Sequence, residues 1–153
     1  MLRDEINNAL KHAMKAQDKD RVSTLRLVSA AIKNADIEAR GTGKEPLGDD
    51  AILGVLQKMV KQREESADLY DKGGRPELAA KEREEIATIS AYLPKPMSDL
   101  EAGSVIQAIV HEINAQSLKD MGRTMAALKE RFAGRMDFAK ASAKVKELLG
   151  GSR

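Results

Sequence analysis

The sequence of 153 residues contains no cysteine and no tryptophan, and aromatic residues make up only 3% of it. Without cysteine there is no disulfide, thiol nucleophile or thiolate metal ligand, which fits a reducing compartment. Few aromatic rings leave few platforms on which unpaired bases could stack. No apolar run is long enough to span a membrane, and the start of the chain lacks the apolar core of a signal peptide. We therefore expect a cytoplasmic protein without membrane association.

The alternation of β-branched and polar residues that is typical of strands is also missing. Apolar residues recur at helical spacing instead, and short connections favour antiparallel neighbours among the first four helices. We expect an all-α fold, with an N-terminal four-helix bundle followed by a small three-helix domain. The predicted helices cover residues 2–17, 20–39, 50–71, 76–92, 99–115, 118–133 and 137–149.

Proline is scarce, but two of the four prolines, Pro94 and Pro96, stand so close together that no helix can continue through them. Ser98 and Glu101 follow with the spacing of a capping box, so a new helix should begin there. We predict a four-helix domain over 1–93, a proline linker over 94–97 and a three-helix domain over 98–153. The glycine-rich stretch 41–48 lacks the Ser/Thr and the preceding strand of a phosphate-binding loop, and we interpret it as a connection.

One polar group of residues falls inside the predicted bundle. Arg63 shares the apolar face of the third helix, and Glu82 and Glu85 lie within the apolar stripe of the fourth. Burying an arginine without a partner would cost several kcal/mol, so we predict a structural ion pair between Arg63 and Glu82 or Glu85. The alternative is a catalytic acid–base pair, which would also need a substrate cleft.

Other signals of chemistry are weak. The only histidines are His12 and His111, and the sequence after His111 lacks the second histidine of a zinc-protease helix. No nucleophile-elbow sequence accompanies either histidine. The sequence therefore predicts no catalytic residue, no metal site and no cofactor.

Positive charge gathers modestly in the last third of the chain, where residues 94–153 include 10 Lys/Arg and 7 Asp/Glu. Such an excess is a hint of a polyanionic partner. Helical spacing predicts that Lys119 and Arg123 lie opposite an apolar stripe formed by Met121, Met125, Leu128 and Phe132, and that Lys140 and Lys144 point away from the core side of the last helix. A shallow basic surface is expected from Lys119, Arg123, Arg131, Arg135, Lys140 and Lys144.

One set of short segments, distributed over nearly the whole chain, has a joint spacing that is more specific than any segment alone: Leu25–Leu27, Ala30–Asn34, Lys61–Ser66, Gly74–Ala79, Glu82–Pro94, Lys119–Gly122 and Gly134–Asp137. Together these segments resemble the GatB/YqeY family, in particular its free-standing YqeY-type members, since no large catalytic domain precedes the matching region. Thr124 departs mildly from the family pattern, in which an apolar residue is common at that position.

The resemblance implies a four-helix domain followed by a three-helix domain. It also links the chain to glutamine-dependent amidotransferases, which are carbon–nitrogen ligases, and in their B subunit the similar region is a tail that helps to hold misacylated tRNA. It thus implies tRNA binding without catalysis, with the amidotransferase or other translation proteins as partners. Two alternatives stay open: a protein–protein interaction module with no RNA role, and an unrecognised glutamine-dependent activity.

Overall fold

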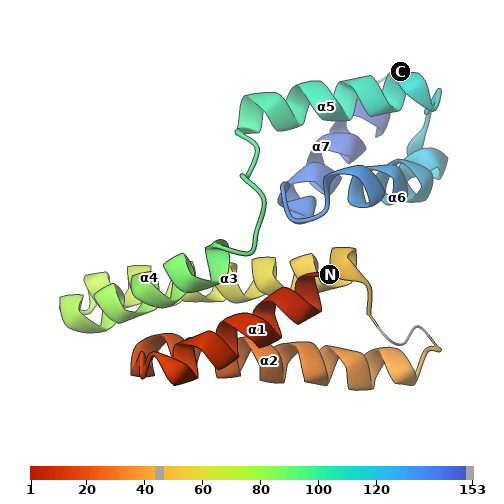
Figure 1. The fold of residues 1–153 in the computed structure, drawn as a ribbon. Helices are drawn as coiled ribbons and strands as arrows, with labels where there is room; N and C mark the ends of the chain where they lie inside the picture. Colours follow the sequence, from red (N-terminus) through yellow and green to blue (C-terminus); the bar gives the residue numbers. More distant parts are fainter. Residues whose placement is uncertain (44–46, 151–153) are drawn as a thin grey trace. The chain divides into compact units, whose positions relative to one another are not determined.

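The computed structural model describes residues 1–43 and 47–150, and within them every regular element is a helix (Figure 1). The predicted all-α fold is thereby confirmed. Residues 44–46 of the predicted connection and the end of the predicted C-terminal domain, 151–153, lie outside the described residues. The α-helices are α1 Leu2–Lys15, α2 Lys19–Arg40, α3 Asp49–Lys72, α4 Pro76–Ser90, α5 Asp99–Glu112, α6 Met121–Phe132 and α7 Phe138–Gly150, with a 3₁₀ turn η1 at Leu118–Asp120.

The chain separates into two compact units, Met1–Pro94 and Lys95–Arg153. The division falls inside the stretch 94–97, where the closely spaced prolines interrupt the helices. No helix in the described part of the chain is both long and apolar enough to cross a membrane.

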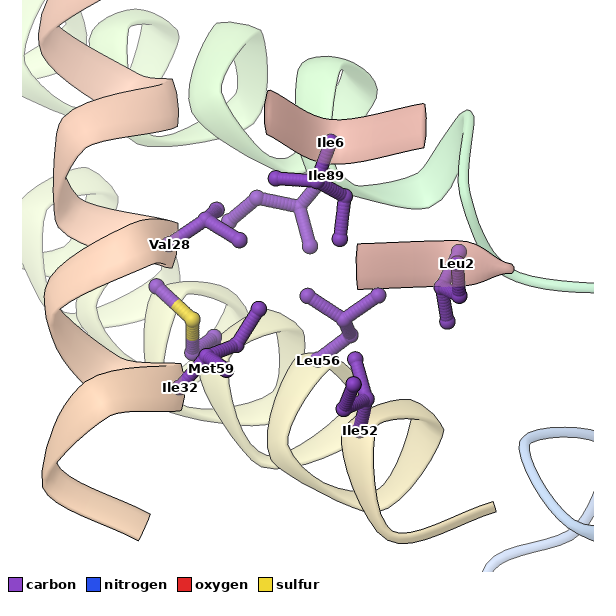
Figure 2. Packing of buried hydrophobic residues seen from close by; sticks show 8 residues of the cluster. All are labelled: Leu2, Ile6, Val28, Ile32, Ile52, Leu56, Met59 and Ile89. Atoms are coloured by element: carbon purple, nitrogen blue, oxygen red, sulfur yellow. The ribbon is translucent and has the colours of Figure 1, made fainter. Parts of the chain in front are cut away.

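The N-terminal unit consists of two helical hairpins, α1–α2 and α3–α4, each with antiparallel helices (Figure 1). Each of the four helices contributes to one core, and Figure 2 shows these side chains pointing toward one another. Burial of such apolar side chains is the main force that holds the two hairpins together. The core residues are Leu2, Ile6, Val28, Ile32, Ile52, Leu56, Met59 and Ile89.

Left-handed residues close three helices and explain why two of them end earlier than predicted. Gly74, with φ +72°, ends α3, and the Arg75 amide bonds the Tyr70 carbonyl at 2.8 Å. Gln17 and Asn114 adopt φ of 56° and 55° and end α1 and α5 in the same way. The helical periodicity of apolar residues continues past these ends, so the periodicity does not reveal where the helices stop. The left-handed residue marks the end of each helix.

The C-terminal unit packs α5, α6 and α7 around a second core. On α6 the structure shifts the buried side relative to the prediction: Thr124 and Leu128 are completely buried, whereas Met121 and Met125 are half-buried. The Thr124 hydroxyl donates to the Asp120 carbonyl at 2.8 Å, which satisfies the buried oxygen. The core residues are Ile106, Ile109, Leu128, Met136, Ala141, Val145 and Leu149.

Two serine caps organise the helix starts of this unit. The Glu101 amide donates to Ser98 Oγ at 3.1 Å, as predicted, but the carboxylate of Glu101 contacts the Ser98 hydroxyl rather than its amide. A complete capping box forms instead at Ser117 and Asp120, which the sequence analysis missed. This second box shapes η1, so Lys119 lies on a 3₁₀ turn before α6 rather than on α6 itself.

Candidate nucleic-acid interface

The six cations predicted to bind RNA all lie in the C-terminal unit, and the structure divides them by residue type. The three arginines make hydrogen bonds within the unit. The three lysines have no ion pair among the described residues. The division follows the chemistry of the side chains, because a guanidinium offers a fork of donors and an ammonium offers a mobile point charge.

Arg123 joins the end of α5 to the start of α6. One of its terminal nitrogens donates to the Ile113 carbonyl at 2.8 Å, and the other donates to Asp120 Oδ1 at 3.1 Å. Ile113 is the residue that caps α5, so the arginine satisfies a carbonyl at a helix end. This cation is therefore part of the framework of the unit, although its side chain is 55% exposed.

Asp120 is the centre of this junction. Its carboxylate accepts the Gln116 amide at 2.8 Å and the Ser117 amide at 3.3 Å in addition to Arg123. The Gln116 amide first, and then Arg123 and the Ser117 amide, hold the pKa of Asp120 below its usual range. The carboxylate is thus charged at neutral pH and offsets the charge of Arg123.

Arg131 forms a two-pronged ion pair with Glu112, at 2.8 and 2.9 Å, which joins α6 to α5. The hydrogen bond from Arg131 keeps the pKa of Glu112 below its usual range. Both side chains are about half exposed, at 46% and 54%, so water weakens the pair. Even so, the neighbouring carboxylate compensates the charge that Arg131 would offer to a phosphate.

Arg135 holds the start of the unit against the turn between α6 and α7. Its Nε donates to the Lys95 carbonyl at 3.2 Å, and its own carbonyl accepts the Met97 amide at 2.8 Å. Gly134 precedes it with φ +78°, a conformation that glycine adopts without strain. Part of the predicted proline linker is thereby attached to the C-terminal unit.

The lysines occupy the outside of α7 and the turn that packs on its end. Lys140 and Lys144 are one helical turn apart on α7; Lys140 is exposed and Lys144 is half-buried. Lys119 is exposed on η1. The neighbouring Leu118 packs on the end of α7, since its side chain lies 3.7 Å from the place where a Cβ on Gly150 would be. Two exposed lysines that the sequence analysis did not select, Lys129 and Lys146, lie on α6 and α7.

A depression of about 510 Å³ also lies in this unit, between the C-terminal ends of α5 and α7. Its lining combines amide and imidazole groups with aliphatic walls and includes no carboxylate. It is lined by Gln107, Val110, His111, Asn114, Ala115, Gln116, Leu148 and Leu149. In the described ranges 1–43 and 47–150, no group of three or more His, Asp and Glu side chains could hold a metal ion.

The charged residues predicted inside the bundle lie in the N-terminal unit. Arg63 Nε donates to Glu85 Oε2 at 3.2 Å, with only 15% and 17% of the two side chains exposed. Arg63 also donates to the Met59 carbonyl at 3.2 Å. Glu82 is half-buried and has no ion pair within the part of the chain that the structure describes. The pair joins α3 to α4 and involves Glu85 rather than Glu82.

Together these features define a small all-helical protein of two units in which Arg63, Arg123 and Arg131 join neighbouring helices. The chain belongs to the YqeY-like protein family, which it matches over residues 3–149.

Its relatives include proteins named "Altered inheritance of mitochondria protein 41, mitochondrial". That of Eremothecium gossypii is 36% identical over 108 residues, which cover 69% of this chain and 57% of the relative. That of Vanderwaltozyma polyspora is 36% identical over 84 residues, or 55% and 44% of the two proteins. An uncharacterized protein of Schizosaccharomyces pombe is 31% identical over 96 residues, or 62% and 74%. The chain spans about half the length of the two mitochondrial relatives.

Proposed function

We propose that this protein is a non-catalytic RNA-binding module that holds a folded RNA, with tRNA as the class of RNA that the family resemblance implies. The observation that carries the proposal is the set of three lysines on the C-terminal unit, Lys119, Lys140 and Lys144, which form no ion pair with a described carboxylate. Contacts from such cations to phosphates supply most of the affinity that does not depend on base sequence.

Lys140 and Lys144 lie on α7, and Lys119 lies on η1, whose Leu118 packs against Gly150 at the end of that helix. Lys140 and Gly150 are ten residues apart, so the three lysines are spread over about 15 Å at the rise of an α-helix. That spread suits contact with several phosphates of a folded RNA rather than with one small anion. The scarcity of aromatic rings also argues for recognition of shape and backbone rather than of unpaired bases. Glu147, one turn beyond Lys144, is exposed and limits the basic surface on that side.

The predicted arginines have a smaller part in this proposal. Asp120 and Glu112 compensate the charges of Arg123 and Arg131, and replacing these arginines would disturb the junctions between α5 and α6. Arg135 Nε bonds the Lys95 carbonyl, and this arginine has no ion pair among the residues that the structure describes. Loss of RNA binding in an arginine variant would therefore not by itself identify an RNA contact.

The proposal extends to an amidotransferase or another translation protein as partner, and to a cytoplasmic location. The family resemblance supports the partner, and the absence of cysteine is compatible with a reducing compartment. No catalytic role is proposed for Glu82 or Glu85, because Glu85 is held by Arg63 in a contact between two helices.

The test is the binding of fluorescently labelled tRNA as a function of salt. The variant Lys140→Glu/Lys144→Glu is compared with Lys58→Glu/Lys81→Glu, which makes the same change in charge at exposed positions of the N-terminal unit. We expect the first pair to reduce the slope of log K against log salt by about two, and a further Lys119→Glu change by about one more. Equal weakening by the control pair, or no tRNA binding at about 50 mM salt, would overturn the proposal.

A further inference from the structure

A second basic surface lies on α2, in the N-terminal unit. Four cations recur at intervals of seven residues along this helix, and all are exposed: Lys19, Arg26, Lys33 and Arg40. Because seven residues fall about 20° short of two full helical turns, these side chains form one ridge about 32 Å long. Figure 1 shows α2 at the edge of its unit, with α1 beside it.

The ridge differs from three other arginines of the unit, Arg3, Arg63 and Arg83, which have carboxylate partners. Arg3 bonds Asp36 at 2.8 and 2.9 Å, and Arg63 bonds Glu85. Lys19, Arg26 and Lys33 have no ion pair among the described residues. Arg40 interacts with Asp36, so the inference rests on the first three cations.

An apolar stripe accompanies the ridge. The side of α2 that faces the core is formed by Leu25, Val28 and Ile32. Leu27 and Ile37 lie outside that side, and they are 45% and 54% exposed. At helical spacing Leu27 and Asn34 alternate with Ala30 and Ile37, which is the pattern of the a and d positions in a helix that pairs with another helix. In that frame Lys19, Arg26 and Lys33 occupy the g positions at the border of the stripe.

We infer that the outer face of α2 binds an amphipathic helix of another protein, with an apolar stripe bordered by acidic residues. The aliphatic stripe would contact the apolar side of that helix, and the lysine and arginine ridge would face its carboxylates. A nucleic-acid backbone would account for the ridge but would leave the exposed Leu27 and Ile37 without a role. This inference does not depend on the proposed binding of tRNA.

A second copy of α2 fits this face less well. In a parallel pair each g position faces an e position of the partner helix, where this sequence has Thr24, Ala31 and Glu38, so only one of three cations would meet a carboxylate. In an antiparallel pair the ridge would face the ridge of the other copy, and like charges would repel.

The first experiment uses the full chain and a synthetic peptide of three heptads with leucine at a and d, one central asparagine at a, and glutamate at e and g. Binding is measured by fluorescence anisotropy. We expect Arg26→Glu/Lys33→Glu to weaken binding at least tenfold and Leu27→Gln/Ile37→Gln to weaken it by a similar factor. The control pair Lys58→Glu/Lys81→Glu should change it less than twofold. A control effect as large as that of Arg26→Glu/Lys33→Glu would overturn the inference, and so would an absence of peptide binding.

The second experiment uses the absence of native cysteine. Ala30→Cys places a single thiol in the stripe, and Ala80→Cys places one at an exposed position of α4 as the matched control. With a cysteine in the central heptad of the peptide, we expect a disulfide only with the Ala30→Cys chain. Equal cross-linking of both chains, or a cross-linked dimer of the Ala30→Cys protein that excludes the peptide, would contradict the inference.

Binding of tRNA by Arg26→Glu/Lys33→Glu distinguishes the two proposals. If this variant loses tRNA binding and the wild-type chain does not bind the peptide, the face of α2 is an RNA surface and the helix-binding inference is wrong. If it loses peptide binding and keeps tRNA binding, the inference is supported whether or not the lysines of α7 contact RNA.

Discussion

The ion pair between Arg63 and Glu85 gives a direct test of the packing of the N-terminal unit. The sequence offers two carboxylates, Glu82 and Glu85, on the same apolar stripe of α4, and the structure pairs only Glu85 with the arginine. Glu85→Gln keeps the shape of the side chain but removes its charge. The guanidinium of Arg63 would then face only neutral acceptors, the Met59 carbonyl and the amide oxygen of the new side chain, while remaining largely out of water.

The expected cost lies between two limits. Removing one partner of a fully buried pair costs about 3–5 kcal/mol, and breaking an exposed pair costs about 0–1 kcal/mol. With 15% and 17% of the side chains exposed and one hydrogen bond of 3.2 Å, Glu85→Gln should cost about 2 kcal/mol. Glu82→Gln should change stability by less than about 0.5 kcal/mol. Replacing both partners, as Arg63→Met/Glu85→Leu, should recover most of the loss because no buried charge is left unpaired.

Urea unfolding followed by tyrosine fluorescence measures this unit selectively. The chain has two tyrosines and no tryptophan, and both Tyr70 and Tyr92 lie in the N-terminal unit. For a urea dependence of about 1–2 kcal/mol per molar, Glu85→Gln should lower the midpoint by about 1–2 M. Equal shifts for Glu82→Gln and Glu85→Gln would refute the assignment of the partner. A double variant no more stable than Glu85→Gln would refute the argument from the unpaired charge.

Two further predictions concern a helix end and an acid transition. Gln17→Gly should raise the stability of the N-terminal unit by about 0.5 kcal/mol, because Gln17 has φ 56° and glycine adopts that conformation without strain; a lower urea midpoint would contradict this. The pKa of Asp120 is depressed in the folded state, so its contribution to stability is complete above about pH 4 and is lost as pH falls through the lower, folded pKa. An NMR titration of the Gln116 and Ser117 amides should place the midpoint below the ordinary value of about 3.9, and a midpoint at or above it would show that these contacts do not favour the charged form.

Most of the fold could be predicted from the sequence because its signals are local. Apolar residues at helical spacing marked every helix, and Pro94 and Pro96 marked the interruption between the fourth and fifth helices. The helix ends were less predictable where a residue other than glycine takes the left-handed conformation. Nothing in the identity of Gln17 distinguishes it from a residue that continues a helix. Asn114 is a weaker stop signal than Gly74, because asparagine takes the left-handed conformation less readily than glycine.

The candidate site was less predictable, because the partner of a charged residue depends on tertiary contacts. Helical spacing correctly gives an outward direction for Arg131, but it gives no information about Glu112, which lies 19 residues earlier on another helix. Arg123 likewise bonds a carbonyl 10 residues away, at the end of α5. Helical periodicity therefore predicts whether an arginine is exposed to solvent. It does not predict whether that arginine is without a hydrogen-bonding partner in the folded protein.

The opposite error affected α2. Residues 1–93 contain nearly equal numbers of acidic and basic residues, so their summed charge predicts no polyanion-binding surface there. The nearly equal numbers of charges hide an uneven distribution over the surface of the unit. The cations of α2 recur every seven residues on its outer side, whereas the carboxylates of Asp36 and Glu85 form ion pairs with Arg3 and Arg63. Charge summed along the chain thus gave no information about the carboxylate partners of Arg123 and Arg131, and it did not reveal the ridge of the N-terminal unit. Since the α7 lysines and the α2 ridge belong to different units, variants of one need not alter the other, and the proposed RNA binding and the proposed helix binding can be tested independently in the same chain.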